Sequence, residues 1–129
     1  MLDMIRPFVE EDRSLVKCEL YVDEDLSGQC VGVCFAFSEK ELFVHAEAVD
    51  DSILLSEELP ASLSDGSIRR ALAPVEWNSA IGCPILWAWT MTNTQGRLDG
   101  LQIEFGTVDH PSITLQIVVR ASTLVLRTL

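Results

Sequence analysis

Long hydrophobic runs are missing from this sequence of 129 residues. The longest nearly apolar runs, residues 30–37 and 82–89, have eight residues each, whereas a membrane-spanning helix needs about 20. The first residues contain an acid at Asp3 and lack the apolar stretch of a signal peptide. We therefore expect no membrane partner and a cytoplasmic location.

Basic residues are scarce, with 9 lysines and arginines against 20 acids, which gives a formal net charge of −11. Residues 1–65 contain 16 of the acids and only 4 of the bases, so the excess negative charge lies in the first half. Such a surface repels phosphate backbones, which argues against direct nucleic-acid binding. Two interpretations of the acidity stay open: a solvated surface that maintains solubility, or a face that recognises a basic protein.

Cysteine pairs of the C-x-x-C type, typical of redox and zinc sites, do not occur among the four cysteines. Cys30 and Cys34 share a face of a strand-like run, but about 13 Å would separate them in an extended strand, which is too far for a disulfide. All four cysteines have apolar neighbours. We interpret them as buried free thiols that act as small hydrophobic side chains.

Catalytic motifs are missing as well. Neither G-x-S-x-G, nor a P-loop, nor G-x-G-x-x-G occurs, so we expect neither a nucleophile elbow nor a nucleotide cradle. Residues 45–47 (His-Ala-Glu) match only the first half of the zinc deaminase signature, because Cys83 lacks the second cysteine. Nothing in the sequence brings together a looser metal site from His45, Glu47, Asp109 and His110. We therefore predict no catalytic residue, no metal ligand and no cofactor, which favours a protein that is not an enzyme.

Alternation of apolar and polar residues, the period-two pattern of β-strands, runs through most of the chain. Alternating segments or short buried runs occupy residues 15–22, 30–37, 42–48, 52–55, 84–92, 101–105, 113–121 and 123–128. The connections lack the helices that parallel strands need, which favours antiparallel pairing. The predicted fold class is mainly β (α+β): a strongly curved antiparallel sheet, barrel-like or a sandwich, with seven to eight strands.

Helices are expected at two places. Residues 67–73 are predicted to form a short helix, because an Asp or Ser N-cap precedes them, Ile68 and Leu72 are four residues apart, and Pro74 follows. Residues 1–13 are predicted to form a short helix or an irregular arm. At this length, residues 1–129 are expected to form a single domain.

The most distinctive segment, residues 82–106, contains a tryptophan-rich strand followed by a polar loop. Trp87 and Trp89 share a strand face, which is more typical of a core than of a binding site. Trp77 lies outside the predicted strands and is interpreted as a lid or a core plug.

The polar loop at residues 93–99 has two interpretations. Gly96 and Gly100 permit the positive φ of a hairpin turn, and Asn93 and Asp99 suit Asx-turns, which favours a purely structural hairpin. The alternative is a recognition loop, because loops and Arg side chains are common in binding sites. Its exposed groups would be Asn93, Gln95, Arg97 and Asp99.

The tryptophan-rich strand and the Asn-x-Gln-Gly…Asp-Gly-Leu-Gln turn that follows it resemble those of small uncharacterised bacterial proteins. The resemblance covers about the last two-thirds of the chain. It implies a β-rich cytoplasmic protein and brings no established activity, so it assigns no catalytic residue.

Two hypotheses of function follow. The first is a non-enzymatic acidic binding protein, of the inhibitor or immunity type, that engages a basic partner. Its candidate binding residues are Asp23, Glu24, Asp25, Asp50, Asp51, Asn93, Gln95, Arg97 and Asp99. The alternative is a small-ligand-binding protein or enzyme with a pocket beside Trp87, Trp89 and the 93–99 loop. A homodimer is expected through the nearly neutral C-terminal strands, since edge strands can pair across a two-fold axis.

Overall fold

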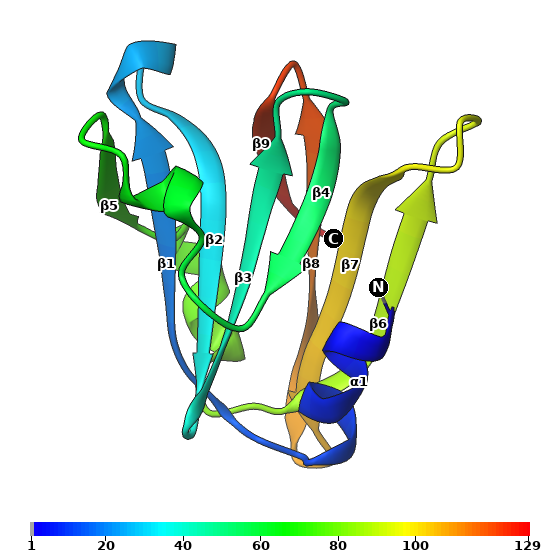
Figure 1. Cartoon of the computed structure of the whole chain (residues 1–129). Coiled ribbons are helices and arrows are strands. Elements are labelled where there is room, and N and C mark those ends of the chain that lie inside the picture. Colours follow the sequence, from blue (N-terminus) through cyan, green and yellow to red (C-terminus); the bar gives the residue numbers. More distant parts are fainter. Residues whose placement is uncertain (1) are drawn as a thin grey trace.

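The computed structural model contains two antiparallel β-sheets that pack face to face (Figure 1). It describes residues 2–129, apart from the side chains of residues 2, 3 and 110. The first sheet comprises β1 (Leu15–Asp23), β2 (Gln29–Phe37), β3 (Lys40–Glu47), β4 (Ser52–Ser56) and β5 (Ile68–Leu72). The second comprises β6 (Ile85–Thr92), β7 (Leu98–Thr107), β8 (His110–Arg120) and β9 (Thr123–Thr128). The helical elements are α1 (Leu2–Glu10) and the 3-10 turns η1 (Glu24–Leu26), η2 (Ala61–Ser64) and η3 (Val75–Ala80).

The strand order is β4-β3-β2-β1-β5 in the first sheet and β6-β7-β8-β9 in the second. Each sheet has its own hydrogen-bonded ladder, so the described residues form a sandwich-like fold and not a closed barrel. The mainly β, antiparallel prediction is confirmed. The described residues form nine strands, one more than the upper number expected, and the additional strand is β5.

The helix predicted at 67–73 is wrong, because this segment is strand β5. It pairs antiparallel with β1, with Ile68 opposite Asp23 and Leu72 opposite Glu19. The four-residue spacing of Ile68 and Leu72 does not mark one buried helical face, since Leu72 is 91% exposed. Asp65 accepts a hydrogen bond from the Ser67 N–H and ends a loop instead of capping a helix. The ladder with β1 therefore overrides a weak local helical signal.

The main core lies between the two sheets and is rich in aromatic side chains. The Phe35 ring stacks on Trp77 with the centroids 6.0 Å apart, and it also lies 5.9 Å from the Phe105 ring. Phe35 comes from β2, Phe105 from β7 and Trp77 from η3. Of the two interpretations of Trp77, the core plug is therefore correct, with 1% of the residue exposed.

A second, smaller cluster lies on the outer face of the first sheet. The connection from β4 to β5 crosses this face and packs Leu63 over Gly32, where a Cβ atom would lie 2.7 Å from the Leu63 side chain. Tyr21, Cys34 and Phe43 pack in the same cluster. His45 of β3 is also buried, at 8% exposure.

Trp87 and Trp89 do not belong to the core, so that interpretation is wrong. They are 57% and 41% exposed, whereas Ile85 on the same strand is 2% exposed. A register shift between Ile85 and Trp87 changes which side chains face inward. The alternation of buried and exposed side chains along β6 is therefore interrupted between Ile85 and Trp87.

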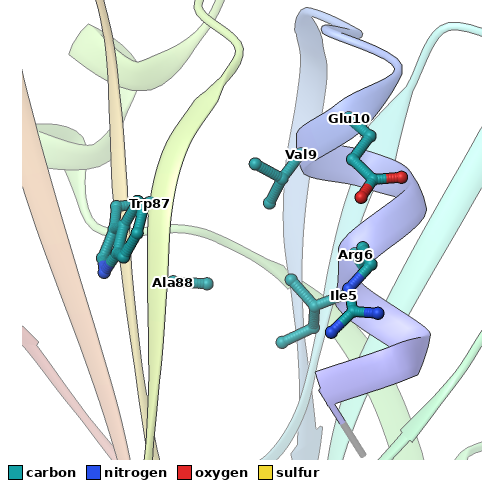
Figure 2. A pocket seen from close by; sticks show the side chains of 6 residues that line it. All are labelled: Ile5, Arg6, Val9, Glu10, Trp87 and Ala88. Carbon is teal, nitrogen blue, oxygen red and sulfur yellow. The ribbon is translucent and has the colours of Figure 1, made fainter.

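Helix α1 packs against β6 on the face that carries Ala88, opposite Trp87 (Figure 2). Ile5 and Phe8 of this helix are buried at 1% and 0% exposure. Of the two interpretations of residues 1–13, a helix over Leu2–Glu10 is correct. Within the described part of the chain, the helices are too short or too polar to cross a membrane.

Candidate functional site

Four connections between strands lie at the same end of the sandwich (Figure 1). They link β1 to β2, β3 to β4, β6 to β7, and β8 to β9. We call this region the acidic end and define it as residues 23–28, 48–51, 93–99 and 121–122. All nine candidate binding residues predicted from the sequence lie in it. Because antiparallel hairpins alternate between the two ends, candidates far apart in sequence come to one end of the fold.

The β1–β2 connection is ordered by its own acids. Asp23 is the N-cap of η1, and its carboxylate accepts a hydrogen bond from the Asp25 N–H at 2.9 Å. Ser27 and Gly28 follow with φ of 58° and 74°, which turn the chain back into β2. Glu24 forms an ion pair with Arg69 of β5. Asp23 thus has a capping role, and the side chain of Asp25 is exposed.

Asp50 and Arg97, both predicted as candidates, form an ion pair across the two sheets. Ser52 donates a second hydrogen bond to the Asp50 carboxylate at 2.5 Å. These partners hold the pKa of Asp50 below its ordinary value, with the Ser52 hydroxyl as the largest cause and the Arg97 charge as another. The contact joins the β3–β4 turn to the 93–99 loop.

Asp51 stabilises a turn in the other sheet. Its carboxylate accepts hydrogen bonds from the backbone N–H groups of Ala121 at 3.2 Å and Ser122 at 2.7 Å. Both turn residues have positive φ, 51° and 65°, a backbone conformation that is costly for residues other than glycine. The two bonds to a charged acceptor offset part of this cost.

The 93–99 loop is a well-ordered hairpin connection. The Asn93 side-chain oxygen accepts hydrogen bonds from the N–H groups of Gln95 and Arg97, at 2.9 Å and 3.1 Å. Gly96 has a φ of 77°. Gln95 is exposed, whereas Asp99 is half-buried and lies in β7. The hairpin expected from Gly96 and Asn93 is therefore present.

A recess of about 150 Å³ opens at the border of the acidic end, next to the β1–β2 connection. Its polar lining groups come from Asp23, Ser62 and Ser122. Most of the remaining lining is apolar and includes Leu26, Val31, Ala46, Ala48, Leu63 and Ile68. Of the sequence candidates, only Asp23 lines this recess. The other lining residues come from six different segments, and no local pattern in the sequence marks them as neighbours.

Three of the four cysteines, Cys18, Cys30 and Cys34, are unsuited to nucleophilic chemistry. Burial raises the pKa of Cys30 to about 11 and that of Cys34 to about 12, and it also raises the pKa of Cys18. Nearby acids add to the effect at Cys34, where the Glu41 carboxylate is the closest. A thiol with a raised pKa is protonated at neutral pH and is a poor nucleophile. The described side chains include no group of three or more His, Cys, Asp or Glu that could hold a metal.

The alternative hypothesis placed a ligand pocket between the tryptophans and the 93–99 loop. A cavity of about 420 Å³ does include Trp87, but it lies between α1 and β6 (Figure 2). Its lining residues are Ile5, Arg6, Val9, Glu10, Trp87 and Ala88. Neither Trp89 nor the loop contributes to this lining.

His45 lies outside the acidic end and is buried without compensation. Its Nδ1 atom finds no hydrogen-bond partner among the residues that the structure describes. Burial lowers the pKa of His45 below its ordinary value of 6.5, although the Glu47 charge acts in the opposite direction. Folding therefore favours the neutral form of His45 over the charged form.

A His45→Leu variant is expected to be more stable than the natural protein, and increasingly so as the pH falls. Removing the unpartnered Nδ1 should add about 1–3 kcal/mol to the free energy of unfolding. Because the unfolded chain takes up the proton more readily than the folded one, the natural protein loses stability as the pH falls below about 6.5. Urea denaturation of both proteins at pH 8 and pH 5.5 measures this difference. The two proteins differ only at residue 45, so an equal difference at the two pH values would contradict the role of His45.

Comparison with known proteins places the chain in a family. The sequence pattern of one family, described as a family of unknown function (DUF6334), matches residues 9–129. The chain belongs to DUF6334. The match covers nearly the whole chain, and it agrees with the resemblance to uncharacterised β-rich proteins. Neither the curated proteins nor the solved structures compared with this DUF6334 member gave a match.

Proposed function

We propose that this DUF6334 protein is a non-enzymatic binding protein whose acidic end engages a basic protein, in the manner of an inhibitor or immunity protein. The observation that carries the proposal is the recess at the acidic end, with Asp23 among its apolar walls. Lysine and arginine side chains combine a long apolar stem with a cationic head. A basic partner could place one such stem against Leu26 and Leu63, with its charge near Asp23.

The charge of the acidic end supports the binding of a basic partner at this end of the sandwich. Two of its acids are paired with arginines, Glu24 with Arg69 and Asp50 with Arg97. The carboxylates of Asp23 and Asp51 accept hydrogen bonds from backbone N–H groups. These groups carry no net charge, so the negative charges of the two aspartates are not neutralised. Acidic loops on a rigid β-sandwich provide both steering and a fixed shape for a basic surface.

The arrangement of the loops also supports a preformed binding face. The β3–β4 turn contacts the 93–99 loop through Arg97 and contacts the 121–122 turn through Asp51. Loops that are tied to one another lose little conformational entropy when they bind. The proposed face would therefore require little reorganisation in the complex.

Removing two charges from the acidic end should weaken binding to the basic partner. The partner would be captured at low salt from a lysate of the source organism, eluted with a salt gradient, and titrated by calorimetry. An Asp23→Asn/Asp25→Asn variant keeps a capping oxygen at residue 23 and should lower the affinity about tenfold, with a shallower salt dependence. Ala48→Leu should also weaken binding, because the larger side chain fills the recess without any change of charge.

A matched control removes two charges from the opposite end of the sandwich. Glu39→Gln/Glu58→Gln changes the net charge by the same amount, and both residues are exposed. We expect its affinity to stay within about twofold of the natural protein. Equal losses for the two charge variants would mean that only net charge matters. Unchanged affinity in Ala48→Leu would exclude the recess as the contact.

A further inference from the structure

The outer side of β6 exposes a group of large apolar side chains. Trp87 is 57% exposed, Leu86 43% and Trp89 41%. The two indole rings lie 6.2 Å apart at an angle of 60°, so they form one continuous aromatic surface. Exposed tryptophans in such a group are unusual on a free surface and are typical of interfaces.

Strand β6 is also an edge of the second sheet, and its other side pairs with no strand of the described chain. Proteins protect edge strands with charged residues, prolines or short length. The other three edges follow this rule: β4 has only five residues, β5 contains Arg69 and Arg70, and β9 contains Arg127. Strand β6 has eight residues, Ile-Leu-Trp-Ala-Trp-Thr-Met-Thr, with neither charge nor proline. It is the one edge strand in the described structure that is long and has neither a charged residue nor a proline, and α1 packs on its inner face.

The charge distribution favours a second copy of the chain over a basic protein as the occupant of this edge. Residues 85–129, which form the sheet to which β6 belongs, contain three acids and three bases, so this sheet carries no net charge. A basic protein would be attracted to the acidic first half and not to this sheet. A second copy of the chain could approach through its own neutral sheet without strong repulsion.

We propose that β6 pairs antiparallel with β6 of a second copy, which joins the two four-stranded sheets into one continuous sheet across a two-fold axis. Trp87 and Trp89 of both copies would then pack together on its outer face. Antiparallel pairing places the two 93–99 loops, and with them the two acidic ends, about 27 Å apart at opposite ends of the strand pair. Parallel pairing would place the acidic ends side by side, where their charges repel. The charge distribution thus favours a second copy of the chain as the partner, and antiparallel pairing over parallel pairing.

Sedimentation equilibrium from about 1 µM to about 200 µM tests the pairing. The natural protein should approach twice the chain mass of 14.3 kDa. A Trp87→Lys/Trp89→Lys variant should remain monomeric, with at least a 30-fold weaker dimerisation constant. Val16→Lys/Leu72→Lys makes the same chemical change at exposed residues of the first sheet and should dimerise as the natural protein does. A natural protein that stays monomeric, or a tryptophan variant that still dimerises, would overturn the proposal.

A spin label in the 93–99 loop tests the orientation. Gln95 is exposed, so Gln95→Cys should react with a nitroxide reagent at neutral pH well before the native thiols of raised pKa. Antiparallel pairing predicts a distance between the two labels of at least about 25 Å. A short distance, with the labels in contact, would contradict the antiparallel arrangement. Circular dichroism of each variant shows whether it keeps the β fold.

Discussion

Replacing Trp77 by alanine is expected to lower the free energy of unfolding by about 3–5 kcal/mol, the range for truncating a fully buried large aromatic residue. Trp77 is 1% exposed and stacks on Phe35 at 6.0 Å with only 16° between the ring planes. It fills space between η3 and the core, so its removal leaves a cavity that the two sheets cannot close. Urea denaturation followed by far-UV circular dichroism measures the loss.

Trp87→Ala is the matched control for this prediction. It removes the same side chain from a residue that is 57% exposed, so the loss should stay below about 1 kcal/mol. Both variants should be measured at a concentration low enough to keep the protein monomeric, because dimerisation would add stability to the natural chain. Comparable losses in the two variants would contradict the assignment of Trp77 to the core.

Alternation of apolar residues was sufficient to predict most of the strands. In the alternating segment 101–105, Leu101, Ile103 and Phe105 occupy every second position, and all three are buried in β7. The pattern works here because one face of the strand meets the other sheet and the opposite face meets solvent. It fails for β5, where Arg69 and Arg70 reflect an exposed edge strand and carry no period-two signal.

Trp87 and Trp89 show why strict alternation of odd and even positions misassigns residues on an edge strand. Ile85, Trp87 and Trp89 share the odd positions of β6, and Ile85 is buried. The register shift after Ile85 places the tryptophans on the outer face. Bulges of this kind depend on the neighbouring strand, so the sequence of β6 by itself could not indicate the shift.

The turns that carry the acid clusters were predictable from the sequence, but the contacts between these turns and the lining of the recess were not. Acid clusters in hairpin turns could be read directly from the sequence, and antiparallel order brings such turns to one end. The pairing of Asp50 with Arg97 joins opposite sheets, and so does the bond from Ser122 to Asp51. These contacts depend on how the two sheets pack, which the sequence pattern does not encode.

Phe8→Ala is expected to destabilise the protein by about 3–5 kcal/mol and to release α1 from β6. The Phe8 ring is fully buried, lies 5.1 Å from the Phe37 ring and has the Lys40 ammonium 5.5 Å from its centroid. A nine-residue helix with an internal proline, Pro7, has little stability of its own. Its position therefore depends on the side chains that it buries, chiefly Phe8 and Ile5.

Amide hydrogen exchange distinguishes release of the helix from a general loss of stability. Exchange in α1 should accelerate more than exchange in β8, whose inward-facing side chains lie in the core. Val9→Ala is the control, because Val9 is only half-buried and its truncation should cost about 1 kcal/mol or less. If Phe8→Ala accelerated exchange equally in α1 and β8, the helix would unfold together with the sheets. Preferential exchange in α1 would instead show that the inner face of β6 is covered by a separately docked element, held mainly by Phe8.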